Sequence, residues 1–148
     1  MSFVKGLAHV ALMVADLDRS LAFYTKVFGF EEMMRINNDA GEVWLVYLRI
    51  TDTVYLEIFP QADSDQTGHW NANGINHLCL EVEDIEAAVA DLEAKGVVLT
   101  QALSQAVDGN WQAWCADPDG NRIELMQMSP DCLQLQAIAR LRASREKA

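Results

Sequence analysis

The sequence predicts an α+β fold made of two consecutive βαβββ modules. The main observation is an internal repeat: the segment GLAHVALMV around His9 recurs as GINHLCLEV around His77, 68 residues later (77 − 9). A second segment, VYLEIF around Glu57, aligns with NRIELM around Glu124 after 67 residues (124 − 57). In each half, a stretch with helical periodicity follows the first strand, and three further strand-like stretches come after it. We therefore expect two copies of one small unit.

The first module is expected over residues 6–59. Its first strand covers residues 6–14, where apolar side chains recur at every second position. Asp16 is positioned as the N-cap of a helix over 17–27, and Gly29 is expected to end that helix. A polar segment at 37–41 is typical of a turn. The three remaining strands of this module are expected near residues 31–37, 42–50 and 53–59.

The second module, expected over residues 74–128, repeats this plan after a polar linker at 60–73. Asp84 is the predicted N-cap of its helix, and Gly96 is the predicted end. The segment DPDGN at 117–121 is a strong turn pattern. Beyond this module, helical spacing of apolar residues predicts a C-terminal helix over about 130–146, which we expect to pack against the domain or a partner subunit. The second module's strands are expected at 75–82, 97–103, 111–116 and 122–128, and its helix at 85–95.

Length and composition favour a soluble single domain of two fused modules. The chain has 148 residues, of which 51% are hydrophobic, and a formal net charge of −11. Such a negative charge argues against nucleic acid or an anionic membrane surface as a partner. The three cysteines have no paired spacing, which is typical of reduced thiols. Because the sequence shows neither a secretory signal nor a membrane span, we expect a cytoplasmic protein.

Four potential metal ligands occupy corresponding positions in the two modules. His9 and His77 lie in the first strands, and Glu57 and Glu124 lie in the last ones. Strand alternation places all four on the face that their apolar neighbours avoid. A single His or Glu of this kind is usually hydrogen-bonded or solvated, but a carboxylate between apolar neighbours is costly to bury unless it is paired or bound to a cation. Because the arrangement occurs twice, we interpret the four residues as one divalent metal site.

The motifs resemble those of the vicinal oxygen chelate superfamily, which includes glyoxalase I, bleomycin-resistance proteins and extradiol dioxygenases. The resemblance covers residues 6–128 and rests on His9, on LAFYTKVFGF at 21–30, on GINH ending at His77, and on DPDGNRIE ending at Glu124. It implies a glyoxalase-like fold in which the two modules form an open, cup-shaped mixed sheet that holds a metal ion. It also implies a small-molecule substrate and a homodimer.

Within that superfamily, the order His9, Glu57, His77 and Glu124 is similar to that of glyoxalase I (lactoylglutathione lyase). Methylmalonyl-CoA epimerase typically has Gln at the position of Glu57, and the dioxygenases use two His and one Glu. The resemblance implies a divalent ion, with Ni²⁺, Co²⁺ or Zn²⁺ favoured over Fe²⁺ or Mn²⁺. The implied reaction is that of a lyase or isomerase, with proton transfer next to a carbonyl through a metal-bound enediolate. Glu124 is the expected base, with Glu57 as its partner.

Three other functions stay open at this point: an epimerase, an Fe(II) dioxygenase, and a non-catalytic resistance protein that binds a drug or metabolite. Two positions also depart from glyoxalase I. Met13 stands where those enzymes usually carry an Arg, and Gln61 stands where they carry an Asn, so contacts to glutathione are reduced. We therefore expect poor use of glutathione hemithioacetals. Arg122, on the same strand face as Glu124, is the candidate for binding a substrate carboxylate, and pairing with Glu81 is its alternative.

Overall fold

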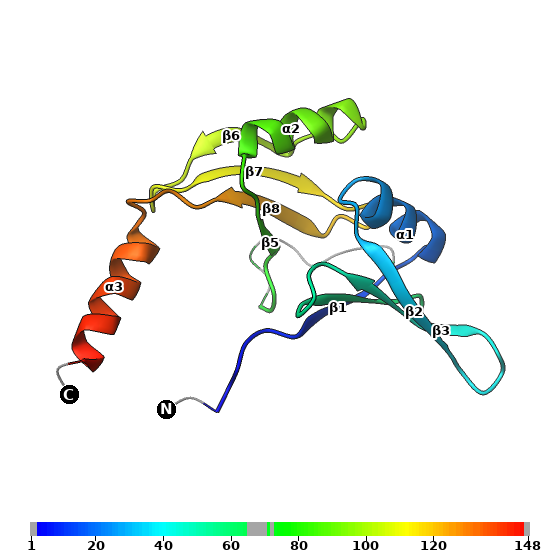
Figure 1. The fold of residues 1–148 in the computed structure, drawn as a ribbon. Helices are drawn as coiled ribbons and strands as arrows, with labels where there is room; N and C mark the ends of the chain where they lie inside the picture. Colours follow the sequence, from blue (N-terminus) through cyan, green and yellow to red (C-terminus); the bar gives the residue numbers. More distant parts are fainter. Residues whose placement is uncertain (1–2, 65–70, 72, 147–148) are drawn as a thin grey trace. The chain divides into compact units, whose positions relative to one another are not determined.

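Figure 1 shows a computed structural model, which describes residues 3–64, 71 and 73–146. Most of the predicted linker, residues 65–70 and 72, lies outside the described residues. The chain divides into two compact units. Unit 1 comprises Met1–His69 together with Asp117–Gly120, and unit 2 comprises Trp70–Ala116 with Asn121–Ala148. Each unit carries a four-stranded mixed sheet, so the predicted α+β class with two βαβββ modules is confirmed.

Unit 1 has the strand order β1-β4-β3-β2, with β1 parallel to β4 and the other neighbours antiparallel. Asp16 caps α1 as predicted, because its side chain accepts a hydrogen bond from the backbone N–H of Arg19 at 3.0 Å. Buried apolar side chains come from α1 and from alternate positions of β3 and β4. The elements are β1 (His9–Met13), α1 (Leu17–Lys26), β2 (Glu31–Asn37), β3 (Val43–Arg49) and β4 (Tyr55–Phe59).

The segment Asp117–Gly120 completes unit 1, although the strands on either side of it belong to unit 2. The hydroxyl of Tyr24, a fully buried side chain of α1, donates to Asp117 Oδ2 at 2.8 Å. Asp119 accepts hydrogen bonds from the Arg19 guanidinium at 2.6 Å and from the backbone N–H of Ala15 at 3.2 Å. This turn therefore supplies two carboxylates to the start and the buried face of α1.

Unit 2 repeats the topology, with strand order β5-β8-β7-β6 and β5 parallel to β8. Asp84 caps α2 by accepting from the backbone N–H of Ala87 at 3.0 Å, again as predicted. In Figure 1, α2 covers one face of β6, β7 and β8. Ala113, Cys115, Ile123 and Leu125 are buried on that face. The elements are β5 (Leu78–Glu81), α2 (Ile85–Ala94), β6 (Gln101–Gln105), β7 (Trp111–Ala116) and β8 (Arg122–Gln127).

Two strands of unit 2 differ from the prediction. β5 starts at Leu78 rather than at residue 75, because the carbonyl of Asn76 accepts from the Arg122 side chain and the ladder with β8 begins only at the Leu78–Ile123 pair. His77 therefore precedes its strand. β6 begins at Gln101, four residues later than predicted, and an irregularity interrupts its pairing with β7 between Gln101 and Ser104.

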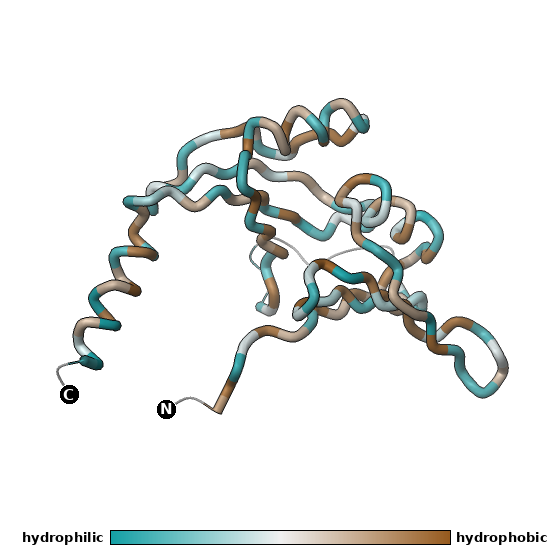
Figure 2. The backbone as a smooth tube through the Cα atoms, viewed as in Figure 1, coloured by the Kyte–Doolittle hydropathy of each residue, from teal (hydrophilic) through white to brown (hydrophobic). Residues whose placement is uncertain are grey.

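The predicted C-terminal helix is present as α3 (Leu133–Arg145), but it does not pack on unit 2. Its first turn is attached to the β6–β7 turn, where the backbone N–H of Leu133 donates to Asp108 O at 2.8 Å. None of its described side chains is buried, and Leu133 and Leu141 are 55% and 59% exposed. The helix extends away from the sheet in Figure 1, and apolar and polar residues alternate along it in Figure 2. Beyond its first turn, α3 therefore does not pack on the sheet of unit 2, and packing against a partner stays a prediction.

Among the helices of the described residues, none combines the length and the apolar character needed to cross a lipid bilayer.

Candidate metal centre

In unit 1, the sheet brings His9 and Glu57 together as the first pair. His9 opens β1, Glu57 is the central residue of β4, and these strands are parallel neighbours. His9 Nε2 lies 3.7 Å from Glu57 Oε2. The imidazole side chain is 49% exposed, whereas the Glu57 side chain is 11% exposed. The neighbours of Glu57 in β4, Leu56 and Ile58, are fully buried, so the predicted alternation of faces is correct here.

Tyr47 supports the carboxylate of the first pair. It is the cross-strand partner of Glu57 in the antiparallel β3–β4 ladder, so the two side chains lie on one face. The Tyr47 phenol donates a hydrogen bond to Glu57, and this bond raises the pKa of Tyr47 above its usual value. Along β3, Leu45, Tyr47 and Arg49 therefore share the face of Glu57, and Trp44, Val46 and Leu48 face the other way.

In unit 2, His77 and Glu124 form the second pair. His77 Nε2 lies 3.0 Å from Glu124 Oε2, and the two side chains are 31% and 14% exposed. Cys79 is the β5 partner of Glu124 and donates a hydrogen bond to it. Protein atoms that displace water from the thiol, together with the Glu124 charge, raise the pKa of Cys79 to about 12, although the residue as a whole is exposed. The thiol is therefore protonated at neutral pH.

Two further residues contact the His77 ring, and a third holds the loop that precedes it. Asn76 Oδ1 lies 2.9 Å from His77 Nδ1. Trp114, the β7 partner of Glu124, meets the imidazole edge-on with ring centroids 4.7 Å apart. Arg122 Nε and Nη2 donate to the backbone carbonyl of Asn76 at 3.0 and 2.6 Å. The guanidinium thus holds the loop in front of His77, and a role for Arg122 in substrate binding stays a prediction.

The four predicted ligands therefore occur as two pairs, one in each unit. In residues 3–64, 71 and 73–146, no group of three or more His, Cys, Asp or Glu side chains could hold a metal ion. Each pair nevertheless has the donors of a transition-metal site, one imidazole nitrogen and one carboxylate oxygen whose side chains face each other. Each pair fits half of such a site, and the four-ligand centre stays a prediction.

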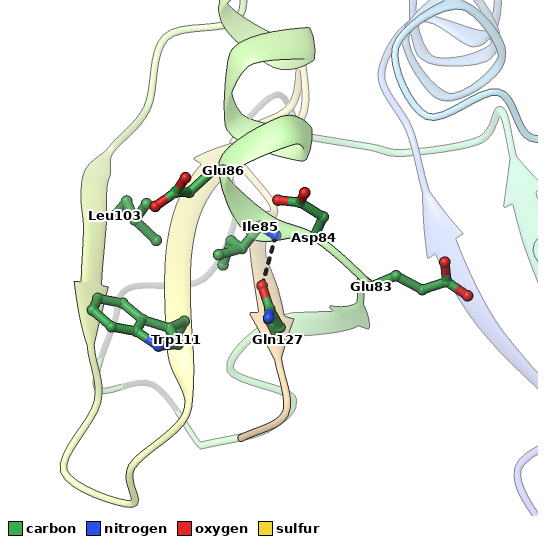
Figure 3. Close-up of a pocket in the computed structure, with 7 residues that line it drawn as sticks. All are labelled: Glu83, Asp84, Ile85, Glu86, Leu103, Trp111 and Gln127. Carbon is green, nitrogen blue, oxygen red and sulfur yellow. Dashed lines mark hydrogen bonds between the residues drawn. The ribbon is translucent and has the colours of Figure 1, made fainter. Parts of the chain in front are cut away.

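A separate cavity of about 370 Å³ lies in unit 2, on the α2 side of the sheet. It is lined by the start of α2, by Leu103 and Trp111, and by Gln127, whose side-chain oxygen accepts from the backbone N–H of Ile85 at 2.9 Å. Gln127 and Glu124 are an odd number of residues apart in β8, so they face opposite sides of the sheet. In Figure 3, Glu83 points away from the cavity. This cavity is therefore distinct from the candidate metal centre.

Comparison with known proteins places these pairs in a family context. Residues 6–125 match the Glyoxalase/Bleomycin resistance protein/Dioxygenase superfamily. The chain belongs to this superfamily. The match spans both units and includes all four predicted ligands, so the resemblance inferred from the motifs is confirmed at the level of the superfamily.

Three members of the superfamily illustrate the range. A lactoylglutathione lyase of Pseudomonas aeruginosa is 30% identical over 145 residues, covering 82% of this chain and 81% of that protein. Human mitochondrial methylmalonyl-CoA epimerase is 32% identical over 105 residues, covering 68% and 58%. The crystal structure of a glyoxalase family protein from Enterococcus faecalis matches with a TM-score of 0.73 and 27% identity, covering 84% and 99%. These relatives support the fold and the superfamily.

Sequence reasoning missed the residues that support the two pairs. Tyr47 was not assigned a role, and Asn76 belonged to the GINH motif without a role of its own. One difference within the repeat marks Asn76, because Ala8 occupies the corresponding position before His9.

Proposed function

We propose that this chain is a metal-dependent lyase or isomerase of the glyoxalase type, which moves a proton next to a carbonyl group of a small oxygenated substrate. The observation that carries the proposal is the duplicated His–Glu pairing, at 3.7 Å in unit 1 and 3.0 Å in unit 2. The 30% identity with a bacterial lactoylglutathione lyase supports the same reaction class. A single His–Glu ion pair on a surface needs no function, whereas two matching pairs can act together as one metal centre.

In this proposal, His9, Glu57, His77 and Glu124 hold one divalent ion. Two imidazoles and two carboxylates suit Ni²⁺, Co²⁺ or Zn²⁺, and they also accept Fe²⁺ or Mn²⁺. When bound, the ion supplies a Lewis acid that stabilises negative charge developing on the substrate oxygen.

Glu124 is the proposed base and takes the proton from the carbon next to the carbonyl group. The hydrogen bonds to the two carboxylates support this choice over Glu57. Glu57 accepts from a phenol, which is a full-strength O–H donor, whereas Glu124 accepts from the thiol of Cys79, which is a weak donor. Apart from its histidine, Glu124 therefore has the weaker hydrogen-bond donor of the two carboxylates. Glu57 is its proposed partner on the other side of the substrate.

An epimerase is the second candidate, supported by the relative named methylmalonyl-CoA epimerase. Removing a proton next to a carbonyl and returning it to the same carbon from the other side inverts that centre, so the two reactions share their first step. Glu57 argues for the lyase or isomerase, because Gln is typical of the epimerase at this position. An Fe(II) dioxygenase and a non-catalytic binding protein remain alternatives, and each predicts a different metal dependence.

The experiment that tests the proposal is removal and replacement of the metal. The purified protein is treated with a chelator, reconstituted with each of the five ions in turn, and incubated in D₂O with a panel of small α-hydroxycarbonyl compounds. We expect Ni²⁺, Co²⁺ or Zn²⁺ to restore deuterium exchange at the carbon next to the carbonyl group, followed by NMR. Oxygen consumption that requires Fe²⁺ would indicate the dioxygenase instead. Failure to bind any of the ions would contradict the proposal and favour the binding protein.

The proposal includes a homodimer in the cytoplasm. Edge strands present unpaired backbone groups that a second chain can cover. α3 adds the exposed apolar residues Leu133, Ile138 and Leu141. We expect light scattering to give twice the chain mass at micromolar concentration. A monodisperse monomer under these conditions would contradict the dimer. If the parent is a dimer, a variant with all three apolar residues replaced by Ser shows whether α3 contributes to it.

A further inference from the structure

We propose that Asn76 is a positioning residue that holds the His77 imidazole in the orientation and tautomer required for metal binding through Nε2. This inference rests on the proposed function, because it takes His77 as a metal ligand. Its basis is the pair of contacts on opposite edges of one ring: Asn76 Oδ1 lies 2.9 Å from Nδ1, and Glu124 Oε2 lies 3.0 Å from Nε2.

The chemistry of the two contacts determines the tautomer. The oxygen of the Asn76 amide accepts hydrogen bonds, so Nδ1 carries the proton that it donates. The proton-bearing nitrogen cannot ligate a metal, so Nε2, on the side of Glu124, is the nitrogen that would bind one. A cation bound at this pair would be held by His77 and Glu124, and the hydrogen bond at Nδ1 would be kept. A hydrogen-bond acceptor at the ring nitrogen that does not bind the metal fixes the orientation of the imidazole and increases metal affinity.

The backbone of Asn76 is itself held in place. Arg122 donates two hydrogen bonds to the Asn76 carbonyl, and Arg122 lies two residues before Glu124 in β8. One strand therefore carries both the carboxylate and the group that fixes the loop containing His77. This arrangement keeps the distance between the imidazole and Glu124 short, although His77 precedes β5 and has no place in its ladder.

The ring is also restrained on its side. Trp114 meets the imidazole edge-on at 4.7 Å, and its Nε1–H donates to Gln112 Oε1 at 2.9 Å, which fixes the indole. Turning the imidazole over by 180° would replace Nδ1 with a carbon atom opposite Asn76 and lose the hydrogen bond. The hydrogen bond at Nδ1 therefore favours the ring orientation in which Nε2 lies on the side of Glu124.

The test compares Zn²⁺ affinity of the full chain and three variants, measured by competition with a chelating dye. Asn76→Ala removes the acceptor, Asn76→Asp keeps an acceptor of similar size, and Asn73→Ala is the control in the same loop. We expect Asn76→Ala to bind Zn²⁺ about 10- to 100-fold more weakly. The Asp variant and the Asn73 variant should stay within about threefold of the parent, as the hydrogen-bonding argument requires. Thermal unfolding of each variant checks that it is folded.

A spectroscopic measurement separates positioning from general loss of structure. In the Zn²⁺-loaded protein, we expect a slowly exchanging Nδ1–H resonance of His77 in the ¹⁵N NMR spectrum, and its loss in Asn76→Ala. A folded Asn76→Ala variant with unchanged Zn²⁺ affinity and an unchanged Nδ1–H would overturn the inference and leave the metal centre standing. A parent protein that binds no Zn²⁺ or other divalent ion would instead contradict the proposed function.

Discussion

The two His–Glu pairs have the same residue types but different supporting contacts. His77 is held by Asn76 and Trp114, and its nitrogen lies 3.0 Å from Glu124. His9 follows Ala8, its side chain is 49% exposed, and its nitrogen lies 3.7 Å from Glu57. Within the described part of the chain, Glu57 is the polar side chain found at the His9 ring. The repeat has therefore kept the His–Glu pair in both units and the support of the imidazole in one.

The supports of the carboxylates differ in the opposite sense, because the stronger hydrogen-bond donor is in unit 1. Glu57 accepts a hydrogen bond from the phenol of Tyr47, and Trp114, which has no hydroxyl, occupies the corresponding position opposite Glu124. Glu124 accepts instead from Cys79, where the first unit has Ala11. Unit 1 thus fixes its carboxylate and unit 2 fixes its imidazole. This difference is what a site needs if one carboxylate is a stable ligand and the other moves a proton.

The largest effect is expected for Glu124→Gln. The variant keeps the size and hydrogen-bonding capacity of the side chain but removes the base, so turnover should fall by about 10²–10⁴-fold at saturating metal. The control is Glu86→Gln, which changes an exposed residue in the first turn of α2 and should be nearly neutral. If Glu57→Gln abolishes proton exchange while Glu124→Gln does not, the roles of the two carboxylates are reversed.

Removing each imidazole tests whether the second pair contributes more to metal binding. We expect both His9→Ala and His77→Ala to lower metal affinity by at least about 100-fold, more than loss of a supporting residue. The larger loss should come from His77→Ala, because its ring is already oriented. Isothermal titration with Zn²⁺ measures both. Tight, stoichiometric binding by the double variant would end the four-ligand hypothesis, and equal losses would show that the supports of His77 do not matter.

The glutathione prediction concerns unit 1. Met13 is 52% exposed at the end of β1 and has no charge to offer a peptide carboxylate. Gln61 already donates its amide N–H to the carbonyl of Trp44 at 3.2 Å. Loss of one charge-assisted bond, worth about 1.5–3 kcal/mol, corresponds to about 10- to 100-fold weaker binding. We expect poor turnover of the methylglyoxal–glutathione hemithioacetal by the metal-loaded protein. A kcat/KM of about 10⁶ M⁻¹s⁻¹ or more would contradict this.

The smallest effect is expected for Tyr47→Phe, which removes the donor to Glu57. Metal affinity should fall by about tenfold, at the lower end of the range for supporting residues. The raised pKa of Tyr47 gives this bond a definite pH range. Folding favours the protonated phenol, so its contribution to stability is complete below about pH 10, the unfolded pKa, and is lost as the pH rises through the higher folded pKa.

Denaturant unfolding of the parent and of Tyr47→Phe measures that pH dependence. Their difference in unfolding free energy should be constant between pH 7 and pH 9 and should shrink above about pH 10. Tyr55→Phe is the matched control, because the Tyr55 hydroxyl donates to a backbone carbonyl, that of Asp52, at 3.3 Å. A Tyr47 effect that changes around neutral pH would contradict the phenol–carboxylate bond.

Much of the fold could be predicted because local chemistry determines it. Asp16 and Asp84 cap their helices as expected, since a short acidic side chain before an apolar helical stretch has one favourable use. The strands Glu31–Asn37 and Trp111–Ala116 match their predicted bounds. The start of β6 was predicted four residues before Gln101. The apolar residues in front of Gln101 resemble a strand but form the connection from α2 to the sheet.

Of the candidate site, only the two His–Glu pairs could be predicted, and their role as metal ligands stays a prediction. Alternation along strands identifies which residues share a face, and this placed Glu57 and Glu124 correctly opposite their buried neighbours. The supports could not be found this way, because they depend on cross-strand register and on side chains that reach across a loop. Tyr47 lies opposite Glu57 only through the β3–β4 pairing, and Arg122 reaches the carbonyl of Asn76 across 46 residues of sequence.

The turn Asp117–Gly120 limits how this protein can be cut. A fragment ending at the linker would contain every strand and helix of unit 1 but would lack the acceptor of the Tyr24 hydroxyl, which is fully buried. Loss of a hydrogen bond of this kind costs about 0.5–1.5 kcal/mol, a noticeable share of the stability of so small a fragment. The repeat in the sequence thus does not divide the protein into two halves that can stand alone, and a split protein needs its second fragment to complete the first.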